Sequence, residues 1–490
     1  MSSTFTSYRI AVSGMAANQV ALTVVTSNIS NVDTEGYSRK QVSATEQVVA
    51  QSATTTSGTG VAVAEIQRAR DTYLDQSYRQ KSAAAGYWEV KATNLTAIQQ
   101  TLNEFSADVD TADNGLQQAF TDFFNSWAEL SKDPTSQTNR QTVVENAQTL
   151  LSTLQDIEAQ LAQLQEDSVA AVQIGVDSVN NLAEQVAKLN GQIAQAELNG
   201  AEAGDLRDQR DSLLDQMAAL TNLKVTENSN GMVEVSIGGV SLVNGTSTRK
   251  LTVVGNGSSE NPLQVQWVDL GIEASITSGS LLANLEDAGQ SGVTAITSLP
   301  YNFSTGSASS ISNLRQGLNV LFTTIATAVN ELQTSGYDLD GNAGIAFFVP
   351  ADSSQPLSLS NSQINPALDD VDLVVASSSG SSGDGSVAER IYDLMSDKTL
   401  FQFGGLSSDL TGFYQSLISW IATAGDNASG YYETQSALVQ QVNNQRQAVA
   451  AVSLDEEMAK MIAYQSAYNA CAKVLTTMDS LIANMIEEWV

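Results

Sequence analysis

The sequence predicts a mainly α-helical protein with inserted β structure, in which the N- and C-terminal helices form a coiled coil. Three observations lead to this fold class. Apolar residues repeat at intervals of seven near both ends, a helical pattern runs through residues 136–199, and apolar and polar residues alternate within residues 225–280. Periods near 3.6 residues indicate helix, whereas a period of two indicates a strand. We therefore expect an elongated helical bundle with a small outer β domain.

The N-terminal helix is predicted from a heptad stripe of apolar residues. The stripe contains Tyr8, Met15, Leu22 and Ile29, accompanied by Ala11, Val25 and Val32, with polar Asn18 among them. On a lone helix this stripe would leave a large apolar patch in water. The helix therefore needs a partner.

The C-terminal helix is predicted from two apolar stripes. The first contains Leu454, Met461, Tyr468, Leu475, Ile482 and Trp489, and the second contains Tyr464, Cys471, Met478 and Met485. Two sustained stripes are typical of a coiled-coil seam. We expect the terminal helices to pack on each other or on neighbouring copies of the chain; an ordinary helical core is the alternative. Cys471 lies on a stripe and is predicted to be a packing residue rather than a reactive thiol.

Several more helices are predicted in the middle of the chain. Apolar spacing indicates helices over residues 95–109, 116–130, 136–199, 205–220 and 311–333, with helix resuming near 387, 410 and 431. The longest would span ~95 Å if unbroken, and Gly175 is a point where it could divide. Pro134 closes the preceding loop, and Asn199 with Gly200 offers a terminator.

Strands are predicted after residue 223. They lie near residues 225–227, 232–237, 251–254 and 263–268, where apolar residues alternate with polar ones. Residues 340–386 are mixed in pattern. They end in a Ser/Gly run at 377–386 that is typical of a flexible loop.

These elements suggest four parts. We expect a terminal coiled-coil assembly domain from residues 1–45 and 447–490, an elongated helical domain from 46–223, 281–335 and 400–446, a β unit at 224–280, and a mixed β and loop outer insertion at 340–399. Pro is absent from the first 133 and the last 124 residues, which permits long helices at both ends.

Composition excludes several classes of function. The 490-residue chain has no His, one Cys, 22 Lys and Arg residues, 54 Asp and Glu residues, and a net charge of −32. Without His, a Ser-His-Asp triad or an imidazole metal site is impossible, and one Cys cannot form a thiolate zinc site. An acidic chain without a basic patch opposes nucleic acid binding. No unbroken apolar run of 18 residues is visible, so we also expect no membrane span.

No catalytic residue, metal site or cofactor is predicted. Four aspartates share one predicted helical face: Asp205, Asp208, Asp211 and Asp215. We interpret them as a solvated face stabilised by the helix dipole rather than as catalytic carboxylates. Asp338 begins a stretch like a calcium loop, but Ala343 and Val349 stand where that motif needs Gly and Glu, so a turn is expected.

The most specific motif follows the N-terminal helix, where residues 28–39 read NISNVDTEGYSR. Physically it is a helix stop and a turn at Gly36. It also resembles the N-terminal signature of bacterial flagellar rod, hook and hook-associated proteins, in which an SNxxN stretch runs into TxGYxR. The matching residues are Asn28, Asn31, Thr34, Gly36, Tyr37 and Arg39.

Further segments narrow the resemblance. Residues 452–470, which contain LDEEM and YQSAYNA, resemble the C-terminal signature of the same proteins. Residues 204–239, beginning GDLRDQRD, and residues 329–348 are similar to the hook-associated protein 1 family, the first of the junction proteins between hook and filament.

The resemblance implies a structural adaptor, not an enzyme, that assembles as a ring or tube at the hook–filament junction. The implied N-terminal assembly residues are Tyr8, Met15, Leu22, Val25, Asn28, Ile29, Asn31, Gly36, Tyr37 and Arg39. The implied C-terminal residues for assembly and for an export chaperone are Leu454, Met458, Met461, Tyr464, Tyr468, Leu475, Met478, Ile482 and Met485. Other implied partners are further copies of the chain, the hook protein and a second junction protein on the filament side.

The resemblance also implies export through the flagellar type III channel without a cleaved signal peptide, and a final location in the extracellular flagellum. The alternatives are another axial subunit (distal rod, hook or flagellin-like) and a secreted enzyme with a flagellar-type export signal. Before assembly the termini are expected to be disordered, because neither stripe would have a partner. The acidic surplus is expected to keep free subunits apart.

Overall fold

The computed structural model describes residues 2–52, 55–102, 115–199, 202–257, 261–289, 301–304 and 309–487. The chain forms two compact units: unit 1 contains Met1–Ala85, Ser178–Lys250 and Gln435–Val490, and unit 2 contains Gly86–Asp177 and Leu251–Thr434. Three helices contribute residues to both units: α2 (Thr72–Leu102), α5 (Gln137–Ala196) and α10 (Leu410–Ala450). The mainly α fold class with small β parts is confirmed. The domain boundaries given above stay a prediction.

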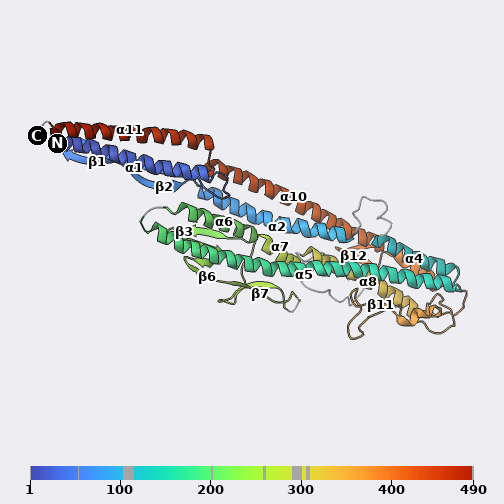
Figure 1. Ribbon diagram of the computed structural model, residues 1–490. Coiled ribbons are helices and arrows are strands. Elements are labelled where there is room, and N and C mark those ends of the chain that lie inside the picture. Colours follow the sequence, from blue (N-terminus) through green and yellow to red (C-terminus); the bar gives the residue numbers. More distant parts are fainter. Residues whose placement is uncertain are drawn as a thin grey trace. The chain divides into compact units, whose positions relative to one another are not determined.

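In unit 1, helix α1 (Ser2–Ser30) lies beside helix α11 (Leu454–Glu487), and both chain ends lie at the same end of this helix pair (Figure 1). The expectation that the terminal helices pack on each other is therefore confirmed. The premise that neither terminal stripe has a partner within the chain is wrong, because each stripe finds the other.

A long β hairpin in unit 1 was not predicted from the sequence. Strand β1 (Lys40–Ser52) pairs antiparallel with β2 (Thr55–Arg68), and the register runs from Lys40 opposite Arg68. Its signal is weak because Thr, Ala, Val and Gln alternate without the large apolar residues that mark a buried strand. The predicted helical domain, which begins at residue 46, therefore contains this hairpin before its first helix.

The rest of unit 1 is a short helix and a four-stranded sheet. Helix α6 is Gly204–Leu220, after a 3-10 turn at Glu197–Asn199. The strands, in the order β3-β4-β5-β6, are Lys224–Glu227, Val233–Ile237, Val240–Asn244 and Ser247–Thr248. Val233, Val235 and Ile237 are buried as their alternation predicts. The strands predicted over 224–280 are confirmed, but the later ones form a separate sheet in unit 2.

Helix α5 confirms the predicted long helix and is continuous through Gly175. Gly175 does not divide the helix but allows close packing, because a Cβ atom there would lie 3.0 Å from Leu281 Cδ1. The predicted terminator at Gly200 lies outside the described residues, as do Phe105 and Val109 of the helix predicted over 95–109. Helix α2 begins at Thr72, where the Asp71 side chain accepts the Tyr73 N–H at 2.8 Å as a cap.

Unit 2 combines helices with short strands. The remaining helices are α4 (Leu116–Lys132), α7 (Ser280–Ala288), α8 (Ser310–Ser335) and α9 (Ser386–Asp393), with 3-10 turns at Pro366–Asp369, Val371–Leu373 and Leu394–Ser396. The strands are β7 (Leu251–Val254), β8 (Gln264–Trp267), β9 (Tyr301–Phe303), β10 (Phe348–Val349), β11 (Gln363–Ile364), β12 (Phe401–Phe403) and β13 (Leu406–Ser408). Pairs β7-β8 and β10-β11 are antiparallel, and β12 lies between β13 and a parallel β9.

A hydrophobic core rich in aromatic residues holds unit 2 together. Phe123, Phe124 and Trp127 of α4 are fully buried. The Trp127 ring lies 5.7 Å from the Phe347 ring, which in turn lies 5.0 Å from Phe348. These tilted arrangements are favourable for aromatic pairs. The apolar spacing of the predicted helices therefore marked the core correctly.

The mixed segment after α8 is tied to that helix by side-chain amides. Gln333 donates to the Val375 carbonyl at 2.9 Å and accepts the Val375 N–H at 3.0 Å. Asn330 accepts the Phe347 and Phe348 N–H groups at 2.8 and 2.9 Å. A packed segment with little regular structure needs such partners for its backbone. The predicted turn at Asp338 is confirmed, since its carboxylate accepts the Asn342 N–H.

The Ser/Gly run at 377–386 is more defined than the flexible loop expected from its composition. The Asp384 carboxylate accepts hydrogen bonds from the hydroxyls of Ser377, Ser378 and Ser379 and from the Ser386 N–H. These bonds hold the pKa of the Asp384 carboxyl well below its ordinary value. A Ser/Gly-rich composition indicates that an isolated segment is flexible, but it does not predict the hydrogen bonds that Asp384 accepts in the folded chain.

Candidate functional site

The seam between α1 and α11 has a single antiparallel register. A Cβ atom at Gly14 would lie 3.1 Å from Cys471 Sγ, and Asn28 Nδ2 donates to Glu457 Oε2 at 2.9 Å. The two contacts are equally spaced along both helices, so the register does not slip between them. Gly14 lets the helices approach closely where Cys471 projects, which fits the prediction that Cys471 is a packing residue.

Most of the predicted assembly residues lie along this seam. Val25 is buried, and the following side chains are partly buried: Met15, Leu22, Ile29, Met461, Tyr464, Tyr468, Leu475, Met478 and Ile482. Met485 belongs to α11, but its side chain lies outside the described residues, and so does Trp489. The structure thus brings the two heptad stripes together, and their role in assembly stays a proposal.

Three apolar or aromatic residues among the predicted assembly residues are exposed in this chain: Tyr8 is 37% exposed, and Leu454 and Met458 are each 44% exposed. Leu454 lies beyond the reach of α1, because α1 ends at Ser30 and the register places Asn28 opposite Glu457. The apolar stripe of α11 therefore extends past its intramolecular partner.

Helix α1 is also covered by the hairpin. The Ser13 hydroxyl accepts the Val61 N–H at 3.1 Å. A Cβ atom at Gly60, where φ is +130°, would fall within 2.2 Å of Ser13 Oγ, so only Gly allows this approach. The N-terminal helix is thus held between α11 and β2.

Residues of the two terminal signatures meet at the end of α1, in a group that we call the signature clasp: Asn28, Tyr37, Lys40 and Glu457. Asn28 is fully buried, and its amide nitrogen donates to the Lys40 carbonyl and to Glu457. Its amide oxygen accepts the Tyr37 hydroxyl and the Lys40 N–H, each at 2.9 Å. All four hydrogen-bonding positions of Asn28 are therefore used.

Glu457 provides the C-terminal half of the signature clasp. Its side chain is 1% exposed and also accepts Lys460 Nζ at 2.7 Å. Arg39 lies next to it: Nη1 contacts Glu456 Oε2 at 3.1 Å, and its N–H donates to the Ala450 carbonyl at 2.8 Å. Two carboxylates of the LDEE motif thus recognise the N-terminal signature, although neither was predicted as a site residue.

The remaining N-terminal signature residues shape the turn. Asn31 Nδ2 donates to the Ser27 carbonyl at 2.9 Å, which closes the last turn of α1. Gly36 has a φ of +79°, a conformation that favours Gly. The predicted helix stop is confirmed. Burial raises the pKa of the Tyr37 hydroxyl, although its hydrogen bond to Ser27 and nearby Lys40 oppose this shift.

A set of buried ion pairs lies behind the signature clasp. Six of these side chains form a closed circuit of alternating charge that we call the arginine ring: Arg70, Asp75, Arg446, Asp215, Arg79 and Asp211. Successive nitrogen–oxygen distances are 2.8, 2.8, 2.7, 2.7, 3.1 and 3.5 Å. The ring joins α2, α6 and α10, together with the link that precedes α2.

Two further residues connect the ring to the signature loop. Asp208 accepts the Ser38 N–H at 2.9 Å and the Ser38 hydroxyl at 2.8 Å. Arg68 bridges Asp208 and Asp211, at 2.8 and 2.9 Å. Burial disfavours ionisation of the Asp211 carboxyl, but Arg70, Arg79 and Arg68 outweigh it and hold its pKa well below the ordinary value.

The interpretation of the four aspartates as a solvated face is wrong for two of them. Asp208 is 6% exposed and Asp211 is 8% exposed, whereas Asp205 is exposed and Asp215 is partly buried. The reason is that their arginine partners come from distant segments, which a local helical pattern does not reveal. The arginine ring was therefore missed.

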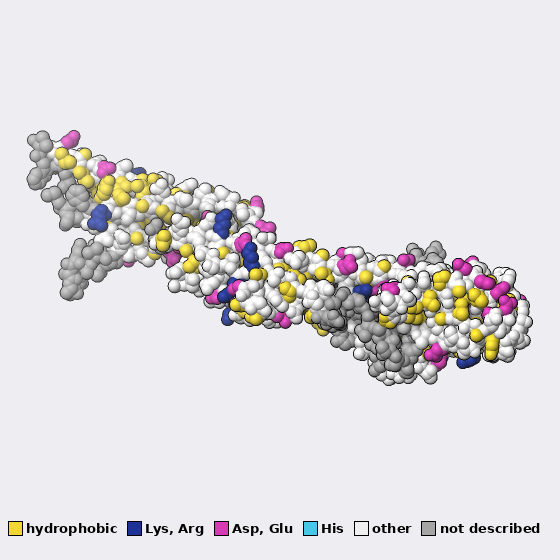
Figure 2. Space-filling model, turned by 90° about the horizontal axis from the view of Figure 1, so that it is seen from below, with side chains coloured by type: hydrophobic (Ala, Val, Ile, Leu, Met, Phe, Trp, Pro, Cys, Tyr) yellow, Lys and Arg dark blue, Asp and Glu magenta, His cyan; other side chains and the backbone are white. Residues whose placement is uncertain are grey.

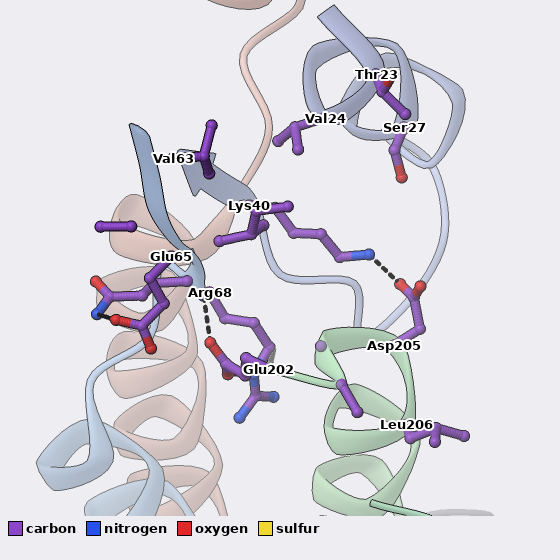
Figure 3. Close-up of a pocket in the computed structure, with 15 residues that line it drawn as sticks. Thr23, Val24, Ser27, Lys40, Val63, Glu65, Arg68, Glu202, Asp205 and Leu206 are labelled. Atoms are coloured by element: carbon purple, nitrogen blue, oxygen red, sulfur yellow. Dashed lines mark hydrogen bonds and ion pairs between the residues drawn. The ribbon is translucent and has the colours of Figure 1, made fainter. Parts of the chain in front are cut away.

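A pocket of about 640 Å³ lies between α1, β2 and the start of α6. In Figure 3 the Lys40 side chain reaches across it to Asp205, at 2.6 Å, and Arg68 reaches Glu202, at 2.9 Å. Glu65 accepts Gln67 Nε2 at 2.6 Å. The labelled charged groups are thus paired with neighbouring side chains. This pairing is typical of structural ion pairs rather than of a catalytic site.

Large apolar side chains remain exposed on the terminal helix pair. On α1 they are Tyr8, Ile10 and Val12, and on α11 they are Leu454, Met458, Ile462, Val474, Leu481 and Ile486. Figure 2 shows hydrophobic side chains gathered toward the end of unit 1 where the termini lie. Exposed apolar surface of this extent is typical of an interaction surface.

One described helix segment, Thr6–Ser30 of α1, is long and apolar enough to cross a membrane by length and composition, with a mean hydropathy of 1.3. The expectation of no membrane span rested on the lack of an unbroken apolar run, and length and composition alone do not exclude this one segment. Buried core helices and signal sequences have the same properties, and in this chain the segment packs against α11 and the hairpin. Among the described residues, no group of three or more His, Cys, Asp or Glu side chains is placed to hold a metal ion.

Three protein-family models match this chain. The model of the flagellar hook-associated protein FlgK helical domain matches residues 102–348. The model described as flagella basal body rod protein matches residues 9–37, and that of the flagellar basal body rod FlgEFG protein C-terminal region matches residues 445–488. The two terminal matches contain Asn28, Tyr37 and Glu457 of the signature clasp.

Individual proteins similar to this chain are also flagellar hook-associated proteins. Flagellar hook-associated protein 1 of Bacillus subtilis (strain 168) is 29% identical over 99% of this chain and 98% of its own length. The protein of the same name from Escherichia coli (strain K12) is 24% identical over 97% of this chain and 98% of its own length. The flagellar hook junction protein FlgK from Burkholderia pseudomallei has a similar fold, with a TM-score of 0.60 at 16% identity, covering 78% of this chain and all of that one.

Proposed function

Because the chain belongs to the flagellar hook-associated protein FlgK family, we propose that it is a structural adaptor subunit of the bacterial flagellum, located at the junction between hook and filament. The observation that carries this proposal is the signature clasp. It joins the N-terminal segment, which is similar to flagella basal body rod proteins, with the C-terminal segment, which is similar to the C-terminal region of flagellar basal body rod FlgEFG proteins. One folded unit thus presents both ends of the chain together.

Assembly proceeds through the terminal helix pair. The apolar side chains left exposed on α1 and α11 gain a partner when neighbouring copies pack against them, and burial of apolar surface stabilises such contacts by about 25 cal/mol per Å². A heterologous contact of this kind repeats around an axis and forms a ring or tube. The exposed apolar side chains are the proposed contacts with other copies, and the seam residues from Met15 to Ile29 and from Met461 to Ile482 hold the two helices together so that these contacts are presented on one surface.

The neighbours in the flagellum are the hook protein on one side and a second junction protein on the filament side. The name of the relatives supports the hook as a neighbour, and the second junction protein is proposed from the resemblance of the sequence to the family. A flagellar export chaperone is the proposed partner of α11 before assembly. The stripe of α11 faces α1 in this chain, so the chaperone must take the place of α1 or bind the outer apolar face.

The chain acts in the flagellum, outside the cell, and reaches it as an unfolded chain through the flagellar export channel. The role is structural and not catalytic, as the names of the relatives support. The match of residues 102–348 to the FlgK helical domain favours a hook-associated subunit over a rod, hook or flagellin-like subunit, and over an enzyme with a flagellar export signal.

The direct test is a strain that lacks this chain. We expect hooks without filaments and filament subunits released into the medium, with filaments restored when the wild-type chain is supplied. Normal filaments on the deletion strain would contradict the proposal.

A further inference from the structure

We propose that the arginine ring positions the terminal helix pair, so that Asp208 and Asp211 on α6 keep α1 and α11 closed although both helices are far from α6 in sequence. The proposal deepens the proposed function and rests on it only for the consequence in assembly. The structural part concerns the chain alone.

The first connection runs from α6 to the end of α1. Asp208 holds both the N–H and the hydroxyl of Ser38, and Ser38 lies between Tyr37 and Arg39. Tyr37 contacts Asn28 in the signature clasp, and Arg39 contacts Glu456 on α11. The position of Asp208 therefore fixes the loop whose side chains recognise α11.

The second connection runs from α6 to the start of α11. Asp215 contacts Arg446 on α10 at 2.7 Å, and Asp75 contacts the same guanidinium at 2.8 Å. Helix α10 ends at Ala450, whose carbonyl accepts the Arg39 N–H, and α11 begins at Leu454. The end of α10 is thus held by the ring just before the short link that leads into α11.

The ring is sensitive to the loss of any carboxylate because its members are mutually dependent. Asp211 compensates Arg68, Arg70 and Arg79, whose side chains are 8–13% exposed. These three guanidiniums share the Asp211 carboxylate, so removing it breaks three buried ion pairs at once, and breaking a buried pair costs more than the pair contributes. We therefore expect a single neutral substitution at Asp211 to open the ring and both connections.

The single cysteine provides a probe of the closed pair. Cys471 is the only thiol in the chain and lies against Gly14 across the α1–α11 seam. A thiol reagent such as DTNB reaches it faster when the helices separate. Of the five tryptophans, Trp88, Trp127, Trp267 and Trp420 belong to unit 2 and Trp489 belongs to unit 1. In a Trp489→Phe background, tryptophan fluorescence therefore reports the folding of unit 2 alone.

The test compares DTNB modification rates of purified wild-type chain, Asp211→Asn and Asp208→Asn. The matched control is Glu184→Gln, which removes an exposed ion pair with Lys250 from the same unit. We expect Asp211→Asn, in the ring, and Asp208→Asn, which connects the ring to the signature loop, to react about tenfold faster or more. Tryptophan fluorescence should be unchanged, and the control should react like the wild type.

Equal modification rates in Asp211→Asn and wild type would overturn the proposal. If Asp211→Asn also unfolds unit 2, Arg79→Lys is measured instead, because it keeps the charge but loses the two-point contact with Asp211 and Asp215. Equal rates in that variant and the wild type would likewise overturn the proposal. The measurement uses purified chain, so its outcome is independent of the deletion phenotype that tests the proposed function.

Discussion

Unit 1 and unit 2 are each stabilised internally by a different kind of interaction. Unit 2 encloses an aromatic and aliphatic core in which Phe123, Trp127 and Leu318 are inaccessible to water. In unit 1, the terminal pair α1–α11 leaves large apolar side chains exposed, and charged and amide groups tie its base to α2, α6 and α10.

The difference separates folding from assembly. A closed hydrophobic core stabilises a chain without a partner, since its apolar surface is already buried. A seam that is only partly buried retains apolar surface for another copy, while polar contacts with strict geometry fix its register. We infer that unit 2 supplies the stable body and that unit 1 supplies a directed interaction surface.

The largest expected effect concerns the core of unit 2. Trp127→Ala removes a fully buried ring that packs against Phe347 and Phe123, and we expect a loss of about 3–5 kcal/mol in the free energy of unfolding. Chemical denaturation followed by circular dichroism measures it. The control is Tyr73→Ala, an exposed aromatic. Equal destabilisation by both substitutions would contradict the assignment of the core.

The next effect should be confined to the terminal pair. In Leu475→Asp with Ile482→Asp, two carboxylates enter the seam, and we expect the pair to open at a cost of about 2–4 kcal/mol with loss of filament assembly and of chaperone binding. Thr476→Asp with Ser480→Asp, on the exposed face of α11, is the matched control. Unit 2 should retain its tryptophan fluorescence. Normal motility of the seam variant would exclude the seam as an assembly surface.

A smaller effect is expected in the signature clasp. Glu457→Ala removes the acceptor of Asn28 and Lys460, and charged hydrogen bonds contribute about 1.5–3 kcal/mol each when their loss leaves a partner buried. Hydrogen exchange of the last turn of α1 should accelerate. Glu487→Ala, exposed on the same helix, should leave exchange unchanged. Slow exchange in both variants would show that the clasp does not hold α1.

The smallest effect is a difference in pH dependence between the units. The pKa of Asp211 is lowered in the folded chain, so its contribution to stability is present above the ordinary value of 3.8 and is lost as the pH falls below it. Burial raises the pKa of Asp287 in unit 2, against the opposing effect of Lys91, so protonation of Asp287 favours the folded state as the pH falls. Asp384 of unit 2 also has a lowered pKa, but its partly exposed carboxylate is screened by solvent and contributes little to stability. Acid should therefore weaken unit 1 before unit 2.

Two signals measured on the same samples from about pH 6 to about pH 2 separate the two units: tryptophan fluorescence, and the reactivity of Cys471 toward an acid-tolerant reagent such as 4,4′-dithiodipyridine, normalised at each pH to that of a free thiol. Asp211→Asn should remove most of the acid dependence of unit 1. Loss of both signals at the same pH in the wild type would show that the units respond as one.

The sequence predicts elements well where burial follows a local period. Val233, Val235 and Ile237 alternate in a strand, and Phe120, Phe123 and Trp127 follow a helical spacing, so both were correctly assigned. The hairpin β1-β2 was missed because small and polar residues carry its alternation. Composition alone predicts the structure of neither unit.

Only those parts of the candidate site that depend on local sequence patterns were predictable. The heptads and the signature identified α1, α11 and the loop at Asn28 to Arg39, because these features are local. Burial of Asp208 and Asp211 was not predictable, since Arg68 and Arg79 lie more than a hundred residues away and Arg446 more than two hundred. Charged residues that meet only after folding leave no period in the sequence.

The central claim is that α1 and α11 of one chain pair in the register defined by Gly14 and Cys471. Gly14→Cys tests it directly, because the 3.1 Å separation of its Cβ position from Cys471 Sγ suits a disulfide. Mild oxidation of the purified monomer should close an intrachain disulfide rapidly, detected by mobility on a non-reducing gel, whereas Ala16→Cys, which is exposed, should not close one. Failure of Gly14→Cys to cross-link within the chain, or cross-linking only between chains, would contradict this account.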